Sequence, residues 1–155
     1  MQKKNKELDF SNQIIFVGID VHKKSWTITI HIAGVQIKTF SINPNPKELS
    51  KYLRNNYPGG IYRSVYEAGF CGYWIDRQLQ ELGIKNIIVN PGDVPTSNKE
   101  KSRKTDNIDS RKLARELSGD YLTGIYIPTE EQEARRVLSR LRIQITKDQT
   151  RMKNK

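Results

Sequence analysis

The feature that most constrains the fold is an uninterrupted apolar run over residues 14–19, which ends in a carboxylate at Asp20. The run is rich in β-branched residues, and such a run suits a strand that is buried on both faces at the centre of a sheet. Asp20 would then stand at the carboxyl end of that strand, where sites form in α/β proteins. The sequence therefore predicts a central strand that leads into a candidate site.

Further strands and helices follow in a regular order. Alternating residues predict strands over 25–31 and 35–42, and short apolar runs predict strands over 61–66 and 84–89. Apolar residues at helical spacing predict one helix around Leu49 and Leu53 and another from Trp74 to Leu82. The order β-β-β-α-β-α-β indicates one α/β domain with a mixed sheet flanked by helices, followed by a helix from about Asn107 to Ser118.

The two ends of the chain have different compositions from this domain. Residues 1–13 are polar and lysine-rich, so we expect a disordered leader before a domain over 14–128. A last helix is predicted behind the cap Thr129, and residues 129–155 would begin a coiled coil. Its apolar seam continues close to Lys155, so we expect a longer native protein. The seam consists of Ala134, Leu138, Leu141 and Ile145.

The charge of the chain indicates a polyanionic partner. The 155 residues carry a formal net charge of +10, and nucleic acid is the polyanion that we expect. No apolar run approaches the ~18 residues of a membrane-spanning helix, and no apolar signal core follows Met1, so we expect a cytoplasmic protein that does not bind membranes. The single cysteine, Cys71, can form neither an internal disulfide nor a cysteine zinc site, so any metal ion would need oxygen ligands.

Four acids stand where such ligands could gather. Asp20 and Glu67 end two predicted strands, and Asp106 and Asp109 open a predicted helix on the stripe that also carries Leu113. Gathered carboxylates repel one another unless cations intervene, and a pair of Mg²⁺ or Mn²⁺ ions about 3.5–4 Å apart can promote phosphodiester displacement. These four acids are therefore predicted as metal-binding and catalytic residues.

Taken singly, each acid has an ordinary explanation. Asp20 can begin a turn, Glu67 can be a solvated strand end, and Asp106 and Asp109 can cap a helix and favour its positive end. In a strongly basic chain, one shared metal site explains the positions of all four acids better than four independent coincidences do. His22 follows the first strand, and we assign it no chemistry.

Basic residues surround the second pair of acids. Their density between residues 99 and 115 suits contacts with the phosphate backbone, which position a nucleic acid without reading its sequence. Residues 93–105 are polar with few apolar residues, so we expect a mobile loop there, and the alternative to nucleic-acid contacts is a loop whose charges are only solvated. The predicted nucleic-acid contacts are Lys99, Lys101, Arg103, Lys104, Arg111, Lys112 and Arg115.

A set of short motifs resembles the amino-terminal domain of the DEDD-motif insertion-sequence transposases, also described as bridge-RNA-guided recombinases. The motifs are GIDVHK at 18–23, YEAG at 66–69 with GY at 72–73, and KTDNID at 104–109, with VNP at 89–91 and VP at 94–95 between them. The resemblance runs from about residue 14 to residue 128. Ser110 departs from the alanine that the resemblance implies, and this small change should not disturb the site.

The resemblance implies an RNase H-like (RuvC-like) fold in which Asp20, Glu67, Asp106 and Asp109 bind the metal ions. It further implies a coiled coil, a separate carboxyl-terminal domain with a catalytic serine, a homo-oligomer, and a structured noncoding RNA that pairs with the DNA. The serine domain is absent from this sequence, so we expect the fragment to be inactive or incomplete in recombination.

Three other functions remain open from the residues. A stand-alone nuclease that resolves Holliday junctions would use the same four acids and would cleave DNA without a further domain. A nucleic-acid-binding module without catalysis would use the aspartates only as caps. A sugar-kinase-like phosphotransferase could share GID at 18–20, but it would need further glycine-rich phosphate loops.

Overall fold

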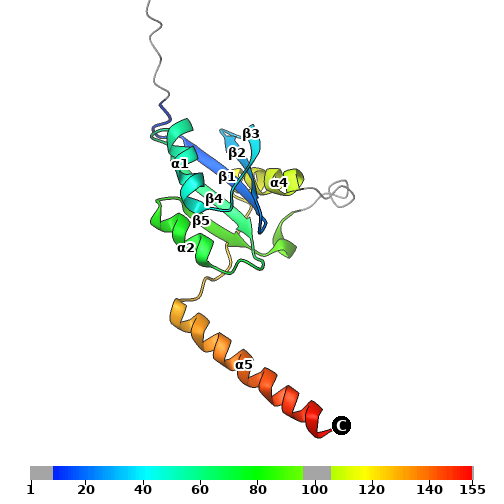
Figure 1. Cartoon of the computed structure of the whole chain (residues 1–155). Coiled ribbons are helices and arrows are strands. Elements are labelled where there is room, and N and C mark those ends of the chain that lie inside the picture. The colour runs from blue at the N-terminus through cyan, green and yellow to red at the C-terminus, as the bar shows by residue number, and fades with distance from the viewer. Residues whose placement is uncertain (1–8, 96–105, 155) are drawn as a thin grey trace, which may run out of the picture. The chain divides into compact units, whose positions relative to one another are not determined.

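A mixed five-stranded sheet forms the centre of the domain that ends at Ile125 (Figure 1). The computed structural model describes residues 9–95 and 106–154, and for residues 106–108 it describes the backbone alone. The sheet order is β3-β2-β1-β4-β5, in which β1 runs antiparallel to β2 and parallel to β4. All five strands match the predicted ones to within one residue at each end, so the expected α/β class is confirmed. The strands are β1 (Ile14–Val21), β2 (Trp26–Ile32), β3 (Val35–Ile42), β4 (Ile61–Glu67) and β5 (Lys85–Val89).

The central strand β1 is covered on both faces, as its continuous apolar run predicts. Ile15, Val17 and Ile19 are fully buried on one face. That face is covered by α1 (Pro46–Asn56) and α2 (Trp74–Glu81), which lie together on one side of the sheet in Figure 1. Strand β1 therefore forms the middle of a layered core.

Helix α4 (Asp106–Ser118) covers the other face of the sheet. Its inner residues Leu113 and Leu117 are buried and pack in one cluster with Val65 and Val89 from the neighbouring strands. Val94 completes the cluster at 4% exposure, so the loop that we expected to be mobile from residue 93 is packed at its start. The reason is a short 3-10 helix, η1 (Pro91–Asp93), that carries Val94 back against the core.

The expected leader and the basic loop are described only in part. Residues 1–8 and 96–105, which include Lys99, Lys101, Arg103 and Lys104, lie outside the described residues. Phe10 packs edge-on against Tyr57 with ring centroids 5.2 Å apart, and its backbone N–H donates to the carbonyl of Pro58. Phe10, in the part of the leader that the structure describes, therefore contacts the domain.

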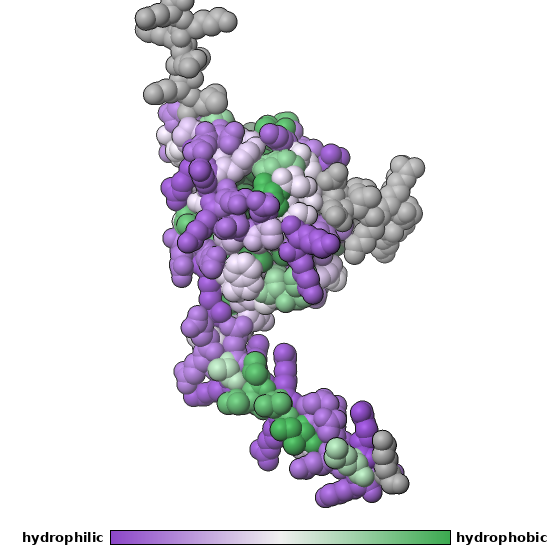
Figure 2. Space-filling view, in the orientation of Figure 1, coloured by the Kyte–Doolittle hydropathy of each residue, from purple (hydrophilic) through white to green (hydrophobic). Residues whose placement is uncertain are grey.

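The chain divides into a unit that ends at Ile125 and a second unit from Tyr126 onward, three residues before the boundary that we predicted. The second unit contains α5 (Glu130–Lys153). Thr129 caps this helix as predicted, and it forms a reciprocal capping box with Gln132. No residue of α5 is buried, and apolar side chains gather along it in Figure 2. These exposed side chains include Leu138, Leu141 and Ile145 of the predicted seam, and the coiled coil stays a prediction. No helix among the described residues has the length and apolar character needed to cross a membrane.

Candidate acidic site

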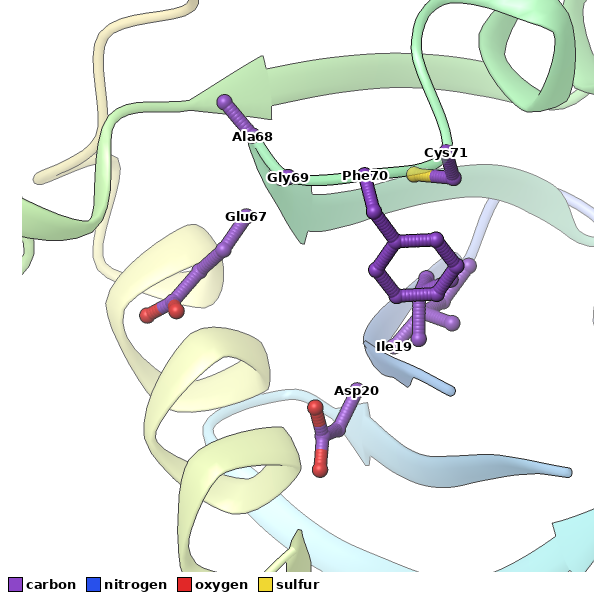
Figure 3. A pocket seen from close by; sticks show the side chains of 8 residues that line it. Ile19, Asp20, Glu67, Ala68, Gly69, Phe70 and Cys71 are labelled. Atoms are coloured by element: carbon purple, nitrogen blue, oxygen red, sulfur yellow. The ribbon is translucent and has the colours of Figure 1, made fainter. Parts of the chain in front are cut away.

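Two of the predicted acids lie side by side at the carboxyl ends of neighbouring strands. Strands β1 and β4 are parallel, and Ile19 pairs with Tyr66, so Asp20 and Glu67 occupy adjacent positions. Both residues line a pocket of about 160 Å³. Figure 3 shows both carboxylates on the side of the sheet that α4 covers. The parallel pairing therefore brings together two acids that are 47 positions apart in the sequence.

The Asp20 carboxylate has a histidine neighbour, His22, to which the sequence alone assigns no role. The side chain of Asp20 is 18% exposed, and the Nε2 of His22 donates to the Oδ2 of Asp20 over 3.0 Å. Residues two apart in an extended chain project to the same side. The spacing of Asp20 and His22 in the sequence therefore indicates that their side chains can meet. His22 therefore helps to fix the orientation of the Asp20 carboxylate.

Helix α4 approaches this pair because a glycine lies beneath it. A Cβ atom at Gly18 would collide with the carbonyl oxygen of Ser110 and would lie 2.5 Å from the backbone nitrogen of Ala114. The backbones of β1 and α4 are therefore in direct contact next to Asp20. This contact fixes the height of the helix above the sheet.

The two helical acids are described to different extents. Asp109 is half-buried and directly precedes Ser110, the residue at the contact with Gly18. Asp106 is the first residue of α4, and its side chain lies outside the described part of the chain. Leu113 is buried, as the predicted stripe requires. Among the described side chains, no three His, Cys, Asp or Glu residues come close enough together to hold a metal ion. The convergence of all four acids thus stays a prediction.

The unexpected Ser110 is part of a buried chain of hydroxyl groups. Its Oγ lies 2.9 Å from the Oγ1 of Thr29 in β2, and this oxygen lies 2.9 Å from the Oγ1 of Thr39 in β3. Ser110 and Thr29 are fully buried. The serine therefore contributes hydrogen bonds between α4 and two strands, which an alanine could not form.

The predicted basic contacts on α4 differ in their surroundings. Arg111 is exposed, and its Nε donates to Thr39 Oγ1 over 3.3 Å. The side chain of Arg115 is 54% exposed, and its Nε donates to Glu116 over 2.9 Å. Lys112 is only 7% exposed, because it lies on a side of the helix that packs against the domain. Arg111 and Arg115 are therefore exposed to solvent, as a phosphate contact requires, whereas Lys112 is buried.

A further acid, Asp76, is buried on the opposite face of the sheet. The Asn86 amide Nδ2 donates to Asp76 over 2.7 Å, and the amide oxygen of Asn86 accepts from Ser64 over 2.7 Å. These bonds tie α2 to β4 and β5. Asp76 therefore has a structural role in holding α2 against the sheet and does not belong to the acidic site.

Curated relatives of the chain are transposases. This chain is 34% identical to the transposase of insertion sequence element IS1533 from Leptospira borgpetersenii over 125 residues. The alignment covers 77% of this chain and 36% of that protein. The chain is 39% identical over 98 residues to a transposase of Sinorhizobium fredii, covering 59% of this chain and 24% of that protein. The chain thus spans between about a quarter and about a third of the length of these relatives.

Two solved structures of low sequence identity were also found. RuvC of T. thermophilus in complex with a Holliday junction substrate aligns with 72% of this chain and 99% of its own, at 10% identity and a TM-score of 0.49. The Fowlpox virus resolvase with substrate Holliday junction DNA aligns with 69% of this chain and 95% of its own, at 16% identity and a TM-score of 0.42.

The family match covers most of the chain. The model of the DEDD transposases of the IS110 type, described as "Transposase", matches residues 17–155. The matched region contains Asp20, Glu67, Asp106 and Asp109, and the chain has the RNase H-like α/β fold that the resemblance implies. By this match, the chain belongs to the DEDD transposase family of IS110-type insertion sequences.

Proposed function

We propose that this chain forms the acidic catalytic domain of an insertion-sequence transposase, which acts in the cleavage and exchange of DNA strands. The observation that carries the proposal is the pair formed by Asp20 and Glu67, which come from adjacent parallel strands and line one pocket. Asp109, half-buried on the helix beside them, would supply a third carboxylate. Asp106, at the start of the same helix, would supply the fourth.

The donor set fits a divalent cation. The pocket offers carboxylate oxygens, which Mg²⁺ and Mn²⁺ prefer, and two neighbouring carboxylates repel each other without a cation between them. When bound, such ions would stabilise the charge that develops on a phosphodiester during cleavage. Asp20 and Glu67 would hold the ions, and His22 would keep the Asp20 carboxylate in one orientation through their 3.0 Å hydrogen bond.

The basic residues would hold the DNA backbone near this pocket. Arg111 and Arg115 are exposed on α4, the helix that also carries Asp109. We propose that they contact phosphates together with the basic residues of the loop before the helix. The net charge of +10 supports this role, because phosphate contacts gain most of their free energy from released counterions. The loop residues are Lys99, Lys101, Arg103 and Lys104.

In the whole transposase, we propose that a structured noncoding RNA guides the reaction and that copies of the protein associate through the α5 seam. A separate domain would supply a serine nucleophile, and the protein would act on the chromosome in the prokaryotic cytoplasm. The family match and the exposed apolar residues of α5 support these proposals.

Calorimetric titration with Mg²⁺ and with Mn²⁺ tests the site. We expect the wild-type chain to bind these ions, and we expect Asp20→Asn or Glu67→Gln to weaken binding at least ~10-fold, since each removes a charged ligand. Asp120→Asn is the matched control, because Asp120 is 86% exposed and contacts Arg63 at the far end of β4. The wild-type titration is repeated with a branched DNA present. If the folded wild type takes up no ion with or without DNA, the metal site is wrong, and the non-catalytic binding module is favoured.

A stand-alone nuclease is the second candidate, because the acidic pair is formed within this chain alone. It predicts ion-dependent cleavage of a Holliday junction by the isolated chain, abolished by Glu67→Gln. Ion binding without cleavage would favour the transposase, whose reaction needs a further domain.

A further inference from the structure

A buried histidine, His31 in β2, lies on the face of the sheet that α4 covers. Its side chain is only 6% exposed. His31 follows Thr29 by two residues, so both side chains project to the same face, and Thr29 contacts Ser110 of α4. His31 also pairs with Phe16 of β1, which packs against the core cluster under α4. His31 therefore belongs to the surface on which α4 packs.

The surroundings of His31 disfavour a charged imidazole ring. Within the part of the chain that the structure describes, its Nδ1 atom is buried and has no hydrogen-bond partner. Burial lowers the pKa of His31, and the guanidinium group of Arg115 on α4 lowers this pKa further by repulsion. A protonated ring would lose its solvation, place an N–H at Nδ1 without an acceptor, and meet a like charge. The neutral ring is therefore the form that fits beneath α4.

The neighbouring strands bring no carboxylate close to this ring. In β1, Asp20 lies on the same face but pairs with Thr27, four residues before His31, which is roughly 13 Å along the strand. In β3, Lys38 pairs with Ile30 and therefore projects to the opposite face of the sheet. Neither β1 nor β3 thus stabilises a positive charge on His31.

Helix α4 adds more positive than negative charge where it packs. The Nε of Arg115 donates to the carboxylate of Glu116 over 2.9 Å, so this carboxylate already has a cationic partner. Lys112, one turn before Glu116, is also buried. These three charges sum to one positive charge, which opposes protonation of a ring beneath the helix.

We propose that neutral His31 keeps α4 packed on the sheet and that protonation of His31 loosens the helix, so that a fall in pH separates Asp109 from Asp20 and Glu67. A charged ring regains water only if the helix above it moves away, and α4 carries Asp109 with it. The effect on ion binding rests on the proposed function, whereas the effect on the packing of α4 does not.

Acidification should therefore destabilise the fold through His31. In the unfolded chain, His31 has its ordinary pKa of about 6.5, whereas the folded chain binds this proton less readily. The unfolded state thus holds more protons as the pH falls below about 6.5, and the free energy of unfolding falls with it. One such group raises the unfolding equilibrium constant by at most ~10-fold per pH unit.

Denaturant unfolding between about pH 5 and about pH 7.5, with a chelator present, tests this contact without a metal site. The chain has two histidines, so His22→Gln leaves His31 as the single imidazole. In this background we expect the unfolding constant to rise severalfold on acidification, with faster hydrogen exchange in α4 than in β4 and β5. His31→Phe in the same background should lose the part of the pH dependence that comes from His31, because phenylalanine binds no proton.

A direct titration of the ring covers the case in which His31→Phe does not fold. Imidazole proton resonances of the His22→Gln chain should give a midpoint for His31 below about 6.5. Arg115→Gln should move this midpoint upward and weaken the pH dependence of unfolding, because it removes the repelling charge. Arg111→Gln is the matched control, since Arg111 lies one turn earlier on α4 and donates to Thr39.

The outcomes separate this inference from the metal site. The same pH dependence with and without His31, or a midpoint for His31 at or above about 6.5, would overturn the inference. Mg²⁺ titration at about pH 7 and at about pH 5.5 then tests the consequence for the acids, and the affinity should fall less on acidification in His31→Phe than in the wild type. Loosening of α4 on acidification in a chain that binds no ion at either pH would support the role of His31 and count against the metal site alone.

Discussion

Helices α4 and α5 are both rich in basic residues, yet their surroundings differ completely. Helix α4 buries Ser110, Leu113, Ala114 and Leu117 against the sheet, whereas α5 buries none of its 24 residues. The position of α4 is therefore set by packing, and a packed helix can hold Asp109 at a defined place. Helix α5 is defined by local interactions, which determine that a helix forms but not what lies against it.

Several local interactions favour the helix α5. It begins with a capping box at Thr129 and carries three acids in its first turn, where they favour the positive end of the helix dipole. Arg135 donates to Glu131 over 2.6 Å, one turn earlier. Its exposed apolar residues then remain for a partner, as the predicted coiled coil requires.

The largest expected contrast comes from one leucine in each helix. Leu113→Ala should lower the free energy of unfolding by about 2–5 kcal/mol, because it opens a cavity in the core under α4. Under conditions in which the chain is monomeric, Leu141→Ala should change it by less than about 0.5 kcal/mol, because Leu141 is 54% exposed. Denaturant unfolding of both variants measures this. A large loss in Leu141→Ala that grows with protein concentration would instead show that α5 is covered by a second copy.

A methyl group at residue 18 tests whether packing sets the position of α4. Gly18→Ala should lower the free energy of unfolding by about 1–3 kcal/mol, because its Cβ meets the backbone of Ser110 and Ala114, which cannot rotate away. The helix should move outward, and divalent-ion affinity should fall with it. Gly34→Ala is the control for ion affinity, since an alanine there is strained by the φ of +78° but meets no neighbouring atom. Unchanged stability and ion affinity in Gly18→Ala would mean that α4 is less firmly seated than its contacts indicate.

Removal of the cap tests the local definition of α5. Thr129→Ala should cost the helix about 1 kcal/mol, since the N–H of Gln132 loses its acceptor. Hydrogen exchange at residues 130–133 should accelerate, while exchange in the sheet should not change. Protection that is equal to that of the wild type would indicate that contacts outside the helix hold its first turn.

The smallest effect is expected for the exposed ion pair of α5. Arg135→Ala should change the stability of the helix by about 0.3–0.5 kcal/mol, because both side chains are about three-quarters exposed and solvent screens their attraction. Circular dichroism at low and high salt measures this, and the difference should shrink as salt is added. A larger effect that is insensitive to salt would point to a packing role of Arg135.

Patterns that depend on neighbouring residues were predicted well from the sequence. The β-branched run of β1, the alternation of β2 and the cap at Thr129 follow from local propensity and periodicity, and all three predictions are confirmed. The adjacency of Asp20 and Glu67 follows from one further rule, which is that parallel strands end at the same edge of a sheet. The acidic pair was therefore within reach of the sequence.

Features that depend on three-dimensional packing were not predicted. Val94 lies in a polar segment, and only the turn of η1 returns it to the core. Lys112 belongs to a run of basic residues, but the rotation of α4 buries it. The contact between His22 and Asp20 depends on side-chain orientation at the end of a strand, which composition does not specify.

The hydroxyl chain of Ser110, Thr29 and Thr39 has a consequence for the rotation of α4 about its own axis. Leucine side chains tolerate small rolling movements of a helix, because dispersion contacts have little directionality. A hydrogen bond has a narrow angular range, so the Ser110 hydroxyl selects one roll angle among those that the leucines allow. Asp109 is the residue next to Ser110, so the same hydrogen bond also fixes the direction in which the Asp109 carboxylate points.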